Sequence, residues 1–264
     1  MTLAPLLFAL VMWFVGTGAV VWLDSRPRAT FRTSFRMAGI VALAATAVVW
    51  ATRGAYDATG AYIGFAAAIA IWGWHELGFL MGFVAGPNHT PRPADATGWR
   101  RFRLATATVI HHELALAATA LALAALTWGQ PNQSATLTFA LLFALRLSAK
   151  LNLYLGVPNL SDEIFPEHLA YLKTHFGRPR AMNALFPFSL LLAGGAFWWA
   201  WSVADATSGG TATAATLIAG LAALGFVEHL FLVLPLRDGA MWRWASNRAV
   251  KPVVITGGEP NHGQ

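Results

Sequence analysis

The chain contains no cysteine, which excludes disulfide bonds, cysteine-based zinc sites and iron–sulfur clusters. Charged residues are scarce as well, because only 11% of the 264 residues are Asp, Glu, Lys or Arg. A soluble domain of this length needs roughly twice that share to cover its surface. The sequence also lacks the G-x-x-x-x-G-K-[ST], G-x-G-x-x-G, G-x-S-x-G and H-E-x-x-H strings. It therefore gives no support to a nucleotide-binding loop, a serine-hydrolase elbow or a helical zinc motif.

Apolar residues are abundant, since 56% of the chain is hydrophobic. They form runs of about 20 residues, the length that crosses the hydrocarbon core of a bilayer. We therefore predict an all-α fold, a polytopic membrane helical bundle with about seven transmembrane helices in one domain over 1–245, followed by an irregular tail over 246–264. The first run has neither a basic segment before it nor a cleavage site after it, so we interpret it as a retained span. The predicted spans are about 2–23, 37–52, 59–84, 104–128, 135–155, 184–203 and 213–234.

Basic residues gather in alternate loops of this arrangement. All 18 Lys and Arg except Arg53 fall on one side of the predicted bundle. The positive-inside rule then places the N-terminus outside, in the periplasm, and the C-terminus in the cytoplasm. The excess of positive charge is explained by topology and by contact with the lipid bilayer, so we expect no nucleic-acid partner.

One amphipathic segment is predicted between spans five and six, within 156–183. Its apolar side chains are expected to lie on the membrane surface, and its polar side chains are expected to meet water. The apolar set is Ile164, Phe165, Leu169, Leu172 and Phe176, and the polar set is Glu167, Lys173 and His175.

Three of the predicted spans carry adjacent His and Glu residues, and the predicted directions of the spans place all of these near the cytoplasmic side. Ionisable residues in a membrane are costly and normally face the bundle interior or a cavity. We therefore predict one shared polar layer with inward-facing His75, Glu76, His112, Glu113, Glu228 and His229, joined by Arg146, Lys150 and Asn152 of span five. His111 is a further candidate for this layer, but His111 and His112 cannot both face inward, because successive helical residues point about 100° apart.

Three interpretations of this polar layer stay open. In the first, the His and Glu side chains bind one or two divalent metal ions, such as iron, zinc or manganese. In the second, Arg146 and Lys150 neutralise the glutamates in a buried network that only orders the bundle. In the third, a histidine ligates the magnesium of a bacteriochlorophyll-type tetrapyrrole, with Trp and Phe side chains around the ring.

Four strings, "WHELGFLMGFVAGP" (74–87), "HHELALA" (111–117), "LNLYLGVPNLSDEIFPEHLAYLK" (151–173) and "FVEHLFLVLPL" (226–236), together carry a family resemblance. The chain resembles the PuhE-type photosynthetic complex assembly proteins of anoxygenic phototrophic bacteria. The resemblance implies a multi-pass protein of the bacterial inner (cytoplasmic or intracytoplasmic) membrane. It also implies a role in assembling reaction-centre and light-harvesting subunits, with a link to bacteriochlorophyll supply.

Two other function classes remain open from the sequence, and it does not decide whether the protein is an enzyme. One is a membrane metalloenzyme, a di-iron-like oxidoreductase acting on a pigment precursor, quinone or carotenoid. The other is a transporter or proton relay, because intramembrane carboxylates serve those functions too. The transporter hypothesis lacks the paired broken helices or inverted repeat that would support it.

Overall fold

The structure is a computed structural model that describes residues 3–159 and 166–234. All regular structure in these two ranges is helical, which confirms the predicted all-α bundle. Six helices are long and apolar enough to cross a membrane, and a seventh span results if the bent pair α4 and α5 is counted as one. The helices are α1 (Leu3–Asp24), α2 (Phe31–Thr52), α3 (Ala58–Leu80), α4 (Gly98–Thr106), α5 (Ile110–Leu126), α6 (Ser134–Leu155), α7 (Phe186–Ala206) and α8 (Gly209–Phe231), with short 3-10 helices η1 (Arg28–Thr30) and η3 (Glu167–His175).

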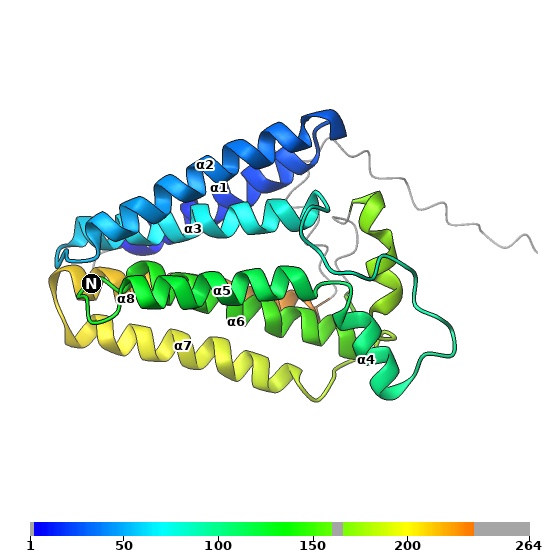
Figure 1. Cartoon of the computed structure of the whole chain (residues 1–264). Helices are drawn as coiled ribbons and strands as arrows, with labels where there is room; N and C mark the ends of the chain where they lie inside the picture. Colours follow the sequence, from blue (N-terminus) through cyan, green and yellow to red (C-terminus); the bar gives the residue numbers. More distant parts are fainter. Residues whose placement is uncertain (1–2, 160–165, 235–264) are drawn as a thin grey trace, which may run out of the picture.

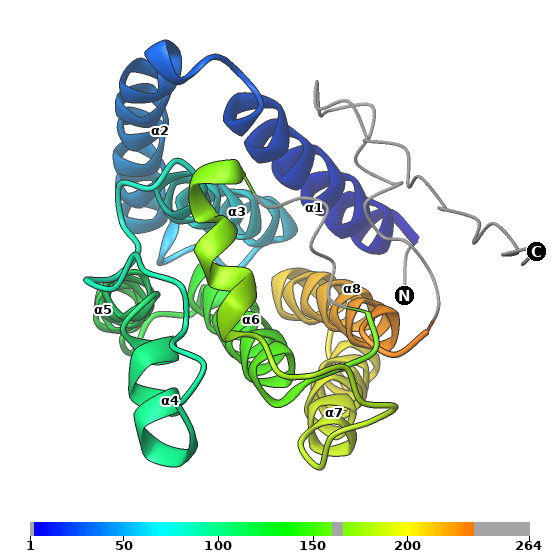
Figure 2. The ribbon, with the colours of Figure 1, turned by 90° about the vertical axis from the view of Figure 1, so that its right-hand side faces the viewer.

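The long helices run side by side, and most of them are joined by short turns into antiparallel neighbours (Figure 1). Helices α3 and α8 form the centre, because 56% of the most apolar window of each is buried, against 11% for α1 and for α2. Around them, α2 packs mainly on α3 and α7 mainly on α8, whereas α6 contacts both central helices (Figure 2). The apolar outer faces of α1 and α2 are therefore the surfaces suited to lipid.

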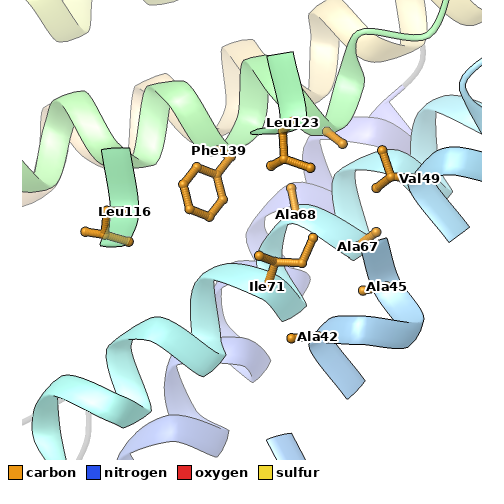
Figure 3. Close-up of a cluster of buried hydrophobic side chains, with 10 residues drawn as sticks. Ala42, Ala45, Val49, Ala67, Ala68, Ile71, Leu116, Leu123 and Phe139 are labelled. Atoms are coloured by element: carbon orange, nitrogen blue, oxygen red, sulfur yellow. The ribbon is translucent and has the colours of Figure 1, made fainter. Parts of the chain in front are cut away.

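One apolar cluster holds the α2, α3, α5 and α6 helices together (Figure 3). Alanines supply the contact between α2 and α3, and small residues of this kind let membrane helices approach closely. Larger side chains from α5 and α6 fill the space beside them. The buried members are Ala42, Ala45, Val49, Ala67, Ala68, Ile71, Leu116, Leu123, Ala135 and Phe139.

The predicted span over 104–128 is not one continuous helix. It is broken between α4 and α5, whose axes differ by 64°. The preceding loop explains the break, because the Asn88 backbone N–H donates to the Ala107 carbonyl and the His112 N–H donates to the Ala85 carbonyl. Gly86 lies so close to the backbone of Ala107 that a Cβ at this position would collide with it. The first turn of α5 is thus bonded to the loop that follows α3, and α4 turns away from the bundle.

The segment between α6 and α7 also differs from its prediction. Residues 160–165, which include Ile164 and Phe165, lie outside the described residues, as does the tail 246–264. Within η3, Leu169 and Leu172 are buried against Phe79 rather than facing lipid. His175 was expected to meet water, but it is 3% exposed, and its Nε2 donates to the Thr90 carbonyl at 3.1 Å. Helix η3 therefore lies across one end of the bundle, over α3 and α6 (Figure 2).

The other predicted spans agree with the helices to within a few residues, except that α2 begins at Phe31, six residues before the predicted start at 37. The loops that hold most basic residues lie at the end of the bundle that η3 covers (Figure 1). The assignment of that end to the cytoplasm stays a prediction.

Candidate functional site

Glu76 of α3 is the centre of the first charged group. The Arg146 Nη2 atom of α6 donates to Glu76 Oε2 at 3.1 Å, and His112 Nε2 of α5 lies 3.8 Å from Glu76 Oε1. The second distance is too long for a hydrogen bond but still brings the two groups into electrostatic contact. His112 is fully buried, and the Phe79 ring covers it with the two ring centroids 4.7 Å apart. One carboxylate thus connects three helices that are distant in the sequence.

A second ion pair is formed by Lys150, which follows Arg146 by one turn of α6, and Glu113 of α5. Lys150 Nζ donates to Glu113 Oε1 at 2.5 Å, and Nζ lies 5.2 Å from the centroid of the Phe79 ring. Arg146 and Lys150 are four residues apart, so they share one face of α6 and meet carboxylates from α3 and α5 respectively. Buried charges require such partners, because an unpaired charge removed from water is strongly destabilising.

A third polar group lies between α6, α7 and α8 and is built from uncharged hydrogen-bonding side chains. His229 Nδ1 donates to the Gly225 carbonyl at 2.8 Å, and its Nε2 lies 3.0 Å from Ser148 Oγ. Ser148 Oγ in turn lies 2.8 Å from Ser189 Oγ. Asn152 Nδ2 donates to Ser189 Oγ at 2.8 Å, and the Asn183 Nδ2 atom donates to Asn152 Oδ1 at 3.1 Å. The neutral groups thus form a continuous hydrogen-bonded chain across three helices.

The remaining candidates are His75, His111 and Glu228. His75 Nε2 lies 2.9 Å from the Thr119 hydroxyl, whereas His111 is exposed and His112 is the inward histidine of the adjacent pair. Glu228 is exposed on α8. Among the described residues, no three His, Asp or Glu side chains come together as a set of metal ligands. Four of the six predicted ligands, Glu76, Glu113, Glu228 and His229, nevertheless line a common cavity, and metal binding stays a prediction.

A cavity of about 560 Å³ borders the charged groups. It lies among α1, α3, α6 and α8, with residues of α5 and η3 at one end. Its charged lining residues are Glu76, Glu113, Glu228, Arg146 and Lys150. His175 and His229 line it as well, and most of the other lining side chains are apolar. A volume of this size is within the range of small-molecule sites, about 300–1,000 Å³. The arrangement is suited to binding an apolar molecule against a small polar wall.

Sequence reasoning missed several polar members of this region. Ser148, Ser189 and Asn183 carry the neutral chain, and the four-residue spacing of Ser148 and Asn152 on an apolar helix was a signal that could have found part of it. The His175 side chain was predicted to face water, but it lines the cavity. Burial lowers the pKa of His175, and the nearby positive charges of Arg92 and Arg101 lower it further, although its bond to a carbonyl acts in the opposite direction.

Comparison with known proteins gives a family and one curated relative. The family described as "Protein of unknown function (DUF3623)" matches residues 1–252. A Rhodobacter capsulatus protein described as "Uncharacterized 30.4 kDa protein in puhA 5'region" is 37% identical over 243 residues, which cover 90% of this chain and 88% of that protein. No solved structure matches the chain.

Proposed function

Because this chain belongs to the family described as proteins of unknown function (DUF3623), whose curated relative is named for the puhA 5' region, we propose a role in photosynthetic complex assembly. The protein acts as an integral membrane factor for bacterial reaction-centre and light-harvesting complexes and is linked to bacteriochlorophyll supply. The family match and the relative together confirm the PuhE-type resemblance found in the sequence. The relative's place in the puhA region is the observation that carries the proposal.

The arrangement of charges supports a binding or scaffolding role over a catalytic one. Two of the carboxylates that line the cavity already have a cationic partner, Arg146 for Glu76 and Lys150 for Glu113. Paired ions of this kind order a bundle without providing a free base or nucleophile. The metalloenzyme alternative has no cluster of ligands in the described part of the chain to favour it.

The outer helices also offer surface for other membrane helices. On α7, Trp198 is 70% exposed and Trp199 is 52% exposed. On α1 and α2, long apolar side chains are exposed along most of the helix. In a bilayer these side chains contact either lipid or the apolar helices of a partner, which suits a factor that meets other subunits within the membrane.

A deletion strain tests the proposal. We expect its membranes to contain less assembled reaction-centre and light-harvesting complex, measured by their absorption bands, while extracted pigment is chemically normal. Wild-type protein and Arg53→Met, altered at the opposite end of the bundle, should both restore the complexes. Unchanged complexes in the deletion strain would refute the assembly role. Loss of pigment with accumulation of a precursor would instead support the metalloenzyme.

A further inference from the structure

Helix α4 is attached to the end of a membrane span. Its Arg101 Nη2 atom donates to the Tyr154 carbonyl at 2.5 Å, and the Arg101 guanidinium lies over the Tyr154 ring, 4.1 Å from the ring centroid. Phe102 packs edge-on against the same ring, with the two centroids 5.8 Å apart. Tyr154 is the last residue but one of α6, which ends at Leu155. Helix α4 therefore lies at the level where α6 leaves the hydrocarbon core, which is the interface between lipid and water.

The direction of α4 suits a helix that lies along the membrane surface. Its axis is inclined by 64° to that of α5, so it runs closer to the membrane plane than to the direction of the spanning helices. Figure 2 shows α4 at the edge of the end of the bundle. None of its nine residues is buried. An amphipathic helix in such a position can bind the bilayer through apolar and basic side chains together.

The sequence of α4 provides both kinds of side chain. Trp99 and Phe102 are three residues apart and stack with their ring centroids 5.1 Å apart. Trp99 is 70% exposed, and tryptophan is enriched at the level of lipid headgroups. Arg100 and Arg103 are also three residues apart and share a neighbouring side of the helix. Helix α4 contains no acidic residue, so its exposed surface is positively charged.

Both of these arginines can reach an anionic group. Arg100 pairs with Asp95, but the two side chains are 59% and 72% exposed, and an exposed pair of this kind contributes little stability. A phosphate can therefore replace the Asp95 carboxylate at small cost. Arg103 is exposed and forms no ion pair with any residue in the two described ranges. The planar guanidinium group binds phosphate oxygens through two parallel hydrogen bonds.

We propose that α4 binds anionic phospholipids, with Arg100 and Arg103 on the phosphate groups and Trp99 at the headgroup level. The occupant is the membrane surface, because lipid headgroups are the anions nearest to the end of a span. An arginine close to an anionic bilayer strengthens binding by a factor of about 5. This binding does not depend on the assembly role, because it rests on the position and the charge of α4 alone.

The lipid selectivity of the full chain tests the binding. The protein is purified in a neutral detergent and titrated with phosphatidylglycerol or phosphatidylcholine, and bound lipid is measured by native mass spectrometry. We expect Arg100→Gln with Arg103→Gln to weaken phosphatidylglycerol binding by about 5-fold or more and to leave phosphatidylcholine binding unchanged. The matched control Arg32→Gln with Arg36→Gln alters two exposed arginines of α2 at the same end of the bundle and should keep the selectivity. Equal losses in both variants, or no loss in the α4 variant, would overturn the proposal. The first result would indicate a general attraction of the basic loops, and the second would leave α4 to an acidic protein partner.

The depth of α4 is tested separately with spin labels, in vesicles that contain phosphatidylcholine and phosphatidylglycerol. Because the chain contains no cysteine, Trp99→Cys and Ala94→Cys each create a single labelling site, the second in the exposed loop before α4. We expect the label on Trp99→Cys to be reached better by lipid-soluble oxygen than by a water-soluble nickel complex, and the label on Ala94→Cys to show the reverse. Equal access of the nickel complex to both labels would overturn the proposal. Spin–spin coupling between two labelled copies of Trp99→Cys would also overturn it, because a second copy of the chain would then cover this surface.

Discussion

Removing the ammonium group of Lys150 tests whether the charged groups act as paired ions that hold the bundle together. Lys150→Met keeps most of the apolar stem and removes the charge, so Glu113 loses its cationic partner. The side chains of Lys150 and Glu113 are 18% and 14% exposed, so screening by water is limited. We expect the variant to be clearly less stable than the wild type.

The magnitude follows from the burial of the pair. Breaking a fully buried ion pair by removing one partner costs about 3–5 kcal/mol. Because both side chains keep a small exposed fraction, the lower limit of about 3 kcal/mol applies here. Replacing both partners removes the stranded charge as well. The double variant Lys150→Met with Glu113→Gln should therefore lose less than the sum of the single variants, by about 2 kcal/mol.

Reversible unfolding in mixed micelles, followed by circular dichroism during titration with a denaturing detergent, measures these free energies. The exposed Arg103 of α4 provides a matched control, because Arg103→Met removes a charge outside the bundle. We expect that control to change the free energy of unfolding by less than about 0.5 kcal/mol. Additive losses in the double variant would refute the ion-pair reasoning. A loss of stoichiometric metal in Lys150→Met or Glu113→Gln would also contradict it, since metal ligation would then explain the carboxylate.

Three further predictions address the loop contacts and the neutral chain. Gly86→Ala should lower the free energy of unfolding by about 1–3 kcal/mol, because the new Cβ would collide with the backbone between α4 and α5. The control Gly195→Ala should leave that free energy unchanged in the same unfolding assay. Asn152→Ala should cost about 1–3 kcal/mol by leaving buried partners unpaired, and an unchanged midpoint would contradict the hydrogen-bonded chain. Burial lowers the pKa of His175, so the folded protein binds a proton at this residue less readily than the unfolded chain does. The free energy of unfolding should therefore be unaffected at neutral pH and fall as the pH drops below about 6.5, the usual pKa of an unfolded histidine. Hydrogen exchange across η3 should accelerate on acidification in the wild type and much less in His175→Gln.

The number and approximate limits of the helices were predictable because each long apolar run is a local property of the sequence. Helix α3 ends within four residues of its predicted end at 84, and α6 ends at Leu155, the predicted residue. The bend between α4 and α5 was not predictable in this way. It depends on backbone hydrogen bonds that Ala85 and Asn88 of the preceding loop form with His112 and Ala107. These partners lie outside the run 104–128, so the pattern of that run does not predict the bend.

For the candidate site, the sequence predicted which residues take part, and only the structure shows how they pair. The sequence placed Glu76, Glu113, Arg146 and Lys150 near one depth, because the helical rise converts position along a span into depth. It could not tell which face of each helix turns inward, so it did not predict that His229 bonds to Ser148. Helix rotation is decided by packing over the whole bundle.

By itself, the sequence determined that this protein is a multi-pass helical membrane protein of the PuhE-type family, because composition, apolar run length and family-specific strings are read along the chain. Only the tertiary structure decided that Arg146 meets Glu76, that Lys150 meets Glu113, and that a cavity lies beside them. These outcomes depend on distances between side chains from different helices, and such distances are set by the rotation and packing of every helix at once.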